Sequence, residues 1–120
     1  MVNEKKNIGN WGENLAKEYL IRHGYKIIAA NYRTGRLEID LITRHNRQLI
    51  FIEVKTRLQT TAGAADNPLT AKQIKNLKQA IIAYCLKNRA SLDAVRLDLI
   101  IVSVDRRQKC ARLKHYRDIF

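Results

Sequence analysis

The chain is poor in cysteine and proline, and its acidic residues are few for its basic ones. Its 120 residues include two cysteines and one proline. Cys85 and Cys110 belong to no CxxC motif or Cys/His cluster, which argues against a zinc site and suits a reducing compartment. Hydrophobic residues make up 46% and charged residues 28%, which excludes a disordered or collagen-like chain. We expect a single domain over residues 1–120.

Long apolar runs are also missing. The longest, Leu97 to Val104, is broken by Asp98 and Ser103 and is far shorter than the ~20 residues of a membrane-spanning helix. The polar N-terminus has no apolar segment of the signal-peptide kind. The sequence therefore predicts a cytoplasmic protein without a membrane partner.

The scarcity of acidic residues gives the chain a strong positive charge. It has 23 Lys and Arg against 11 Asp and Glu, for a net charge of +12. Such a balance favours a polyanionic partner, with nucleic acid as the first candidate and an acidic membrane surface as the second. A surface that is merely basic is the third interpretation.

Hydrophobic spacing predicts the order of helices and strands. Apolar residues recur at helical spacing over 8–23, and Thr70 with Gln73 forms a capping box at the start of a second helix. Alternating or β-branched stretches predict strands between and after these helices. The expected fold is α/β, with a mixed sheet flanked by helices. The strands are expected over 25–30, 37–43, 48–55, 97–104 and 110–116.

Three acidic residues stand alone in the most basic part of the chain. Between Tyr19 and Ala65 the only acids are Glu38, Asp40 and Glu53, all on the hairpin expected over 37–55. A hairpin loop with an even number of residues places Asp40 and Glu53 on one side of the sheet. A loop at 45–48 makes them direct partners, whereas a loop at 45–46 makes them diagonal neighbours.

Paired carboxylates suggest a metal site. They repel each other unless a cation lies between them, and Mg²⁺ or Mn²⁺ accepts such oxygen ligands. We expect Asp40, Glu53 and the backbone carbonyl of Val54 to hold the metal, with Lys55 orienting the attacking water in phosphodiester hydrolysis. The competing interpretation is an ordinary half-solvated hairpin with a Glu38–Lys55 ion pair.

The first helix adds a further candidate, Glu13. It follows Gly12, and glycines at 9 and 12 indicate close packing of the helix. Glu13 is either an extra carboxylate of the metal site or a solvent-facing glutamate near the start of the helix. Trp11 and Tyr19 are expected in the core rather than as platforms for stacked bases.

Basic and polar residues around the hairpin are the candidates for nucleic-acid contact. We expect a loop over 57–68 beside the site, and the N-terminus of the second helix is suited to phosphate. The candidate contacts are Arg33, Arg36, Arg57, Lys72 and Gln73.

Six motifs occur in order along the chain: Gly9-x-x-Gly12-Glu13-x-x-Ala16, Gly24-Tyr25, Asn31-Tyr32-Arg33, Glu38-Ile39-Asp40-Leu41-Ile42, Phe51-Ile52-Glu53-Val54-Lys55-x-Arg57 and Arg96-Leu97-Asp98. Together they resemble the YraN family of small, uncharacterised bacterial proteins. That family is similar to the restriction-endonuclease-like superfamily, which includes archaeal Holliday-junction resolvases. The family usually has glycine where this chain has Leu37.

The resemblance implies an αβββαβ core and a metal-dependent endonuclease acting on DNA, with branched or damaged structures among its candidate substrates. It implies that Asp40 and Glu53 are metal ligands, Lys55 is the catalytic lysine and Glu13 is the helix glutamate of resolvase-like members. Cleavage of both strands would require a homodimer. The alternative is a non-catalytic nucleic-acid-binding module with a nuclease-like fold.

Overall fold

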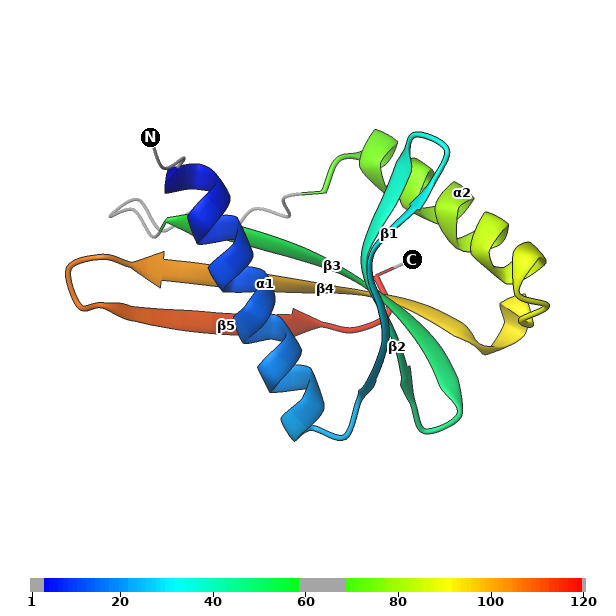
Figure 1. The fold of residues 1–120 in the computed structure, drawn as a ribbon, viewed down its shortest axis with the longest axis horizontal. Coiled ribbons are helices and arrows are strands. Elements are labelled where there is room, and N and C mark those ends of the chain that lie inside the picture. The colour runs from blue at the N-terminus through cyan, green and yellow to red at the C-terminus, as the bar shows by residue number, and fades with distance from the viewer. Residues whose placement is uncertain (1–3, 59–68, 120) are drawn as a thin grey trace.

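The computed structural model describes residues 4–58 and 69–119, which form one five-stranded sheet with a helix on each face (Figure 1). The strand order is β1-β2-β3-β4-β5; β3 and β4 are parallel and every other neighbouring pair is antiparallel. The elements are α1 (Glu4–Arg22), β1 (Lys26–Thr34), β2 (Leu37–His45), β3 (Gln48–Leu58), α2 (Ala71–Lys87), a 3-10 turn η1 (Leu92–Ala94), β4 (Val95–Asp105) and β5 (Cys110–Tyr116).

This order confirms the expected α/β fold and mixed sheet. The predicted last strand matches β5, and the capping box at Thr70 is present, with Gln73 N–H donating to Thr70 Oγ1 at 3.1 Å. Five elements extend beyond their predicted bounds. Helix α1 begins at Glu4, β1 continues to Thr34, β2 to His45 and β3 to Leu58, and β4 covers Val95–Asp105. The expected loop over 57–68 lies outside the described residues except for positions 57 and 58, which belong to β3.

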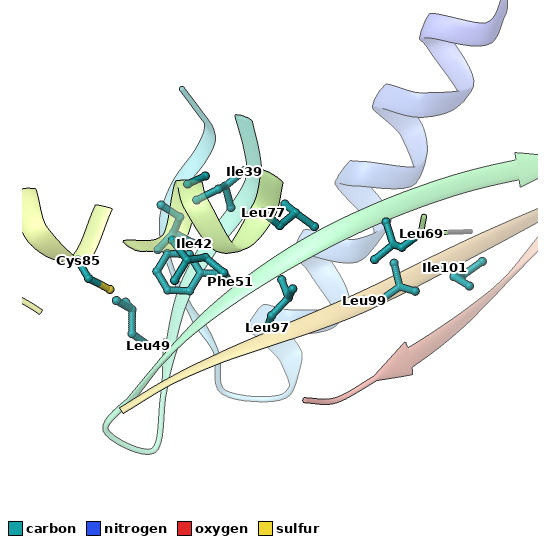
Figure 2. Close-up of a cluster of buried hydrophobic side chains, with 12 residues drawn as sticks. Ile39, Ile42, Leu49, Phe51, Leu69, Leu77, Cys85, Leu97, Leu99 and Ile101 are labelled. Atoms are coloured by element: carbon teal, nitrogen blue, oxygen red, sulfur yellow. The ribbon is translucent and has the colours of Figure 1, made fainter. Parts of the chain in front are cut away.

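Each face of the sheet carries its own hydrophobic cluster. Under α2 lie Phe51, Ile42 and Leu97 of the sheet with Leu77 and Cys85 of the helix (Figure 2). The other cluster lies under α1, which contacts β3 and crosses the sheet in the foreground of Figure 1. Because both faces are covered, apolar residues that point to either face of the central strands are buried. That second cluster includes Ala16, Leu20, Leu41, Ile52 and Ile100.

Two tight turns fix the register of β1, β2 and β3. Gly35 has a φ of 61° at the first position of the β1–β2 turn, and Asn46 and Arg47 both have positive φ in the β2–β3 turn. Leu41 is opposite Ile52 in the second hairpin. One position further along, this register places Asp40 opposite Glu53, as the loop at 45–48 predicts. In the first hairpin, Gly35 supplies the turn that precedes Leu37.

Strand β2 rotates at Asp40. Ile39 lies in the cluster under α2, whereas Leu41 lies in the cluster under α1. Alternate residues of a regular strand share a face, so the opposite placement of Ile39 and Leu41 shows that the strand is not regular here. The recorded pairing between β2 and β3 also ends at Leu41 and Ile52. The two strands therefore part next to Asp40.

The buried carboxylate of Asp98 links β4, β5 and the residues that follow β5. Asp98 is fully buried and accepts two hydrogen bonds from Arg96, both at 2.8 Å, one from His115 Nε2 at 2.7 Å and one from the Asp118 N–H at 3.0 Å. Burial alone raises the pKa of Asp98, but the bonds from His115 and Arg96 outweigh it and lower the pKa to about 2. The acid is therefore ionised and fully partnered.

Neither helix of the described residues is long and apolar enough to cross a membrane. The cysteines are both free, and Cys85 is buried in the cluster under α2.

Gly12 sets the contact between α1 and β3. A Cβ at Gly12 would overlap the Thr56 hydroxyl and lie 2.8 Å from Thr56 Cβ, so no side chain fits without movement of the helix. Gly9 is different, because a Cβ there meets no described atom within 4 Å. Close packing is thus confirmed for Gly12, whereas for Gly9 the described residues contradict it.

The two glycines give a matched pair of variants. Gly12→Ala is expected to lower the free energy of unfolding by about 1–3 kcal/mol, because the helix must move away from β3. Gly9→Ala is expected to be neutral or to stabilise by up to ~1 kcal/mol, because alanine favours the helix. Urea denaturation of both variants measures the difference, and equal effects would contradict the contact.

Candidate functional site

The Asp40 and Glu53 side chains meet at the point where β2 and β3 part. Continued pairing would bring Val54 opposite Ile39, but the Val54 N–H instead donates to Asp40 Oδ2 at 2.8 Å. The Glu53 carboxyl forms a hydrogen bond with the Asp40 carboxyl. The two acids that the sequence singles out therefore touch each other.

Their contact changes the protonation of Glu53. Burial, the hydrogen bond with Asp40 and repulsion from the Asp40 charge raise the pKa of Glu53 from 4.5 to about 9, although attraction to Lys55 opposes this. A hydrogen bond between two carboxyls needs one proton, and the raised pKa keeps that proton on the pair at neutral pH. Unlike the buried carboxylate of Asp98, this pair includes no cation that neutralises both acids.

Lys55 shares a side of β3 with Glu53. The two residues are separated by one position in the strand, and the charge of Lys55 acts on the Glu53 carboxyl. Val54 points the other way, against the cluster under α1, which leaves only its backbone groups near the acids. The Asp40, Glu53 and Lys55 groups are thus brought together as the sequence predicts.

A small pocket opens beside Glu53, between α2 and the β1–β2 hairpin. Its volume is about 170 Å³. Gln73 reaches it from the first turn of α2, where its Oε1 accepts from the Thr70 N–H at 2.9 Å and its amide nitrogen remains as a donor. The lining residues are Arg36, Leu37, Glu38, Glu53, Gln73, Asn76 and Leu77.

Sequence reasoning missed two residues of this pocket as site residues. Asn76 lies three positions after Gln73 on α2, and helical spacing is the signal that places both on one face. The competing interpretation, an ordinary hairpin, paired Glu38 with Lys55. The ion pair of Glu38 is instead with Arg33, whose Nε lies 3.7 Å from Glu38 Oε2. The divergence of β2 from β3 explains this correction.

Glu13 lies within electrostatic reach of Asp40. Burial and repulsion from Asp40 raise the pKa of Glu13, while Lys17 and a hydrogen bond with Asn31 lower it. One carboxyl oxygen, Oε1, is buried and has no hydrogen-bond partner among the described residues. A buried carboxyl oxygen without a partner favours a cation or a hydrogen-bond donor nearby. The interpretation of Glu13 as a solvent-facing glutamate does not account for this oxygen.

The basic candidates border this region in different ways. Arg36 lines the pocket, and Lys72 is exposed in the first turn of α2. Arg33 is 78% exposed on β1, although its guanidinium is engaged by Glu38. Arg57 is half-buried near the end of β3, two positions after Lys55.

The donor set fits a hard cation with few protein ligands. Within residues 4–58 and 69–119, no three His, Cys, Asp or Glu side chains form a group that could hold a metal by themselves. Mg²⁺ commonly uses one or two carboxylates and takes its other ligands from water and phosphate. Asp40, Glu53 and the Val54 carbonyl match that requirement, and the unpartnered Glu13 oxygen adds negative potential beside them.

Trp11 is not a core residue. Its side chain was expected in the interior, but 43% of the residue is exposed, at the edge of a second groove on the other side of α1. Helical spacing correctly groups Trp11 with Leu15 and Tyr19. It does not reveal whether the sheet is wide enough to cover all three.

Comparison with known proteins identifies relatives over nearly the whole chain. Residues 12–102 match the model of "Uncharacterised protein family UPF0102". A UPF0102 protein of Syntrophotalea carbinolica is 34% identical over 120 residues, covering 100% of this chain and 96% of that protein. Another, of Syntrophomonas wolfei, is 35% identical over 100 residues, covering 83% of this chain and 87% of its own. These matches confirm the resemblance to the YraN family.

One similar solved structure is SfsA of Pyrococcus furiosus in complex with Ca²⁺. It is 16% identical with a TM-score of 0.45, and the match covers 94% of this chain. This chain spans 63% of the length of that protein, which is less than two thirds.

The proton on Glu53 gives the stability of the fold a defined pH dependence. With the folded pKa raised from 4.5 to about 9, the folded state holds a proton that the unfolded chain has lost between those values. The free energy of unfolding therefore falls as pH rises through this window. Glu53→Gln removes that slope and is expected to stabilise the fold at pH 8.5 by on the order of 1–2 kcal/mol, after allowance for solvent screening.

Thermal and urea denaturation from pH 5 to 9 test this expectation. Asp93→Asn, at an exposed carboxylate in the turn before β4, is the control and should retain the slope of the unchanged chain. Equal pH slopes for Glu53→Gln and the unchanged chain would show that Glu53 is not the responsible group.

Proposed function

Because this chain belongs to the uncharacterised family UPF0102, whose name states no activity, we propose its function from its site: a metal-dependent endonuclease that hydrolyses phosphodiester bonds in DNA. The observation that carries the proposal is the contact of Asp40 and Glu53 without a neutralising cation, with Lys55 on the same side of β3 as Glu53. Branched and damaged DNA are the proposed substrates, and the cytoplasm is the proposed compartment.

Each residue of the site has a proposed task. Asp40 and Glu53 hold the metal, and the Val54 N–H fixes the direction of the Asp40 carboxylate. The Val54 carbonyl adds a backbone ligand. Lys55 orients the attacking water and stabilises negative charge on the reacting phosphate, while Glu13 adds negative potential that favours the cation.

Mg²⁺, or Mn²⁺ in its place, supplies Lewis-acid chemistry when bound, since it polarises a phosphate oxygen and lowers the pKa of a bound water. Glu53 must release its proton for both carboxylates to serve as ligands. Metal binding at Asp40 and Glu53 is therefore expected to strengthen as pH rises toward 9.

The basic and polar residues beside the site suit a DNA backbone. Arg36, Gln73 and Asn76 surround the pocket next to Glu53, and Lys72 stands at the N-terminus of α2, where exposed N–H groups favour a phosphate. Arg33 and Arg57 extend this basic surface on β1 and β3. A chain with one such site cuts one strand, so cleavage of both requires two copies related by a twofold axis.

A non-catalytic nucleic-acid-binding module is the second candidate. It is favoured by the observation that, over the residues described, no three acidic, histidine or cysteine side chains form a metal-holding group. In that case the pair would remain protonated at Glu53 and would serve the fold alone. Binding would then be independent of metal.

Cleavage assays separate the two candidates. The unchanged chain with Mg²⁺ or Mn²⁺ is expected to cut a four-way or flapped DNA. Asp40→Asn and Lys55→Ala are each expected to lower the rate at least a hundredfold, because the metal or the oriented water is lost. Lys75→Ala, on the exposed face of α2, is the matched control and should cut normally. Intact DNA across several forms and both metals would reject the endonuclease.

DNA binding without metal gives a separate measurement. Lys72→Ala and Arg36→Ala are expected to weaken binding to all sequences alike and to reduce its dependence on salt, because each removes a contact to phosphate. Lys87→Ala, at the other end of α2, provides the comparison. Fluorescence polarisation at several salt concentrations measures these slopes. Unchanged slopes for the first two variants would place the DNA elsewhere.

A further inference from the structure

A second groove lies between α1 and the β4–β5 pair. Its volume is about 340 Å³, twice that of the pocket beside Glu53, and nothing in the proposed hydrolysis uses it. Trp11, Leu15 and Tyr19 form one wall, at positions i, i+4 and i+8 of α1. Val102 and Leu113 lie across from them.

The aromatic wall of this groove is fixed in place. The Tyr19 hydroxyl lies 2.9 Å from His115 Nδ1, and His115 is held in turn by the buried Asp98 carboxylate. The His23 ring packs on the Tyr19 ring with a centroid separation of 4.3 Å, and His23 Nδ1 lies 2.8 Å from the Tyr19 carbonyl. Tyr19 thus gives the groove one aromatic side chain held in a fixed position, which lowers the entropy cost of packing an occupant against it.

Positive charge surrounds this apolar surface. Arg22 and Lys109 line the groove against a single acid, Glu18. The β4–β5 turn that provides Lys109 also carries Arg106 and Arg107. An occupant with an apolar flat face and a negatively charged edge complements this arrangement, and a nucleotide has both features.

We propose that this groove binds an unpaired nucleotide of a DNA strand, with its base stacked on Trp11 and its phosphates toward Arg22 and Lys109. The volume is at the lower end of the range for small-ligand pockets. A docked amphipathic helix, about 10 Å across, needs a longer trough. A base in a duplex cannot reach such a surface, so the groove selects DNA that contains unpaired nucleotides.

The groove is linked to the proposed catalytic strand through Gly12. Gly12 packs on Thr56, the neighbour of Lys55, while Trp11 and Glu13 flank Gly12 on α1. An unpaired nucleotide on Trp11 would therefore lie on the α1 face of the sheet, whereas Glu53 and Lys55 project from the other face of the same strand, β3. This inference rests on the proposed function for the reaction, and it adds the class of substrate: forks, flaps and other DNA with a single-stranded segment.

Trp11 is the chain's only tryptophan, so its fluorescence reports on the groove directly. The protein is titrated, with EDTA present to prevent cleavage, with a dT12 oligonucleotide, an oligo(U) of equal length and a blunt 12-bp duplex. Binding is followed in parallel by polarisation of a dye on the nucleic acid. We expect dT12 to quench Trp11 emission on binding, and the duplex to bind without quenching.

Variants make the test specific. Trp11→Ala is expected to weaken dT12 binding about tenfold or more and to leave duplex affinity within twofold, whereas Trp11→Phe retains most of the dT12 affinity. Leu86→Ala removes another exposed apolar side chain, 75% exposed on α2 and outside the groove, and should change neither. Circular dichroism confirms that each variant is folded.

Several outcomes would overturn the proposal. Saturating dT12 without quenching, or equal losses of dT12 and duplex binding in Trp11→Ala, would show that no base stacks there. Stronger quenching by oligo(U) than by dT12 would assign the groove to RNA. Quenching by an acidic amphipathic peptide but not by dT12 would assign it to a protein partner.

The inference and the proposed function fail in different ways. Cleavage that depends on Asp40, together with unquenched Trp11, rejects the groove and keeps the endonuclease. Quenching by dT12 with no cleavage of any DNA keeps the groove and rejects the endonuclease.

Discussion

The hydrogen bond from the Val54 N–H to Asp40 Oδ2 holds β2 and β3 together where their pairing ends. Without it, the rotation of β2 that sends Ile39 and Leu41 to opposite faces would carry the Asp40 carboxylate away from Glu53. The same divergence leaves room for the pocket between the β1–β2 hairpin and α2. Where the pairing of β2 and β3 ends, Asp40 and Glu53 are therefore in contact, and Glu53 remains accessible from the pocket.

The buried Asp98 and the half-buried pair of Asp40 and Glu53 differ in how their charges are neutralised. Asp98 lies on β4 among the bidentate guanidinium of Arg96, His115 and a backbone N–H, and its pKa falls to about 2. Glu53 has a second acid as its nearest partner, and its pKa rises to about 9. A fold that surrounds Asp98 with a guanidinium, an imidazole and a backbone N–H has the means to neutralise Asp40 and Glu53 in the same way. Under the proposed function, a ligand with positive charge would relieve the repulsion between Asp40 and Glu53.

Local pattern predicted much of this structure. The Thr70 capping box and the even turn between β2 and β3 depend on neighbouring residues, and parity alone then places Asp40 and Glu53 on one side. The rotation at Asp40 was not predictable, because it arises where β2 leaves β3 and no spacing within β2 signals it. The exposure of Trp11 depends on the width of the sheet under α1 for the same reason.

The Asp98 cluster was only half visible in the sequence. Arg96 and Asp98 alternate along a strand, which places them on one side and could have suggested their ion pair. His115 and Tyr19 join them from β5 and α1, 17 and 79 positions away, and such contacts follow only from the sheet order. Because of this order, α1 lies between the acid pair and the groove beside β4 and β5. Its contact at Gly12 directs Glu13 toward Asp40 and Trp11 toward the β4–β5 side, so one helix position controls the surroundings of the acid pair and of the aromatic groove together.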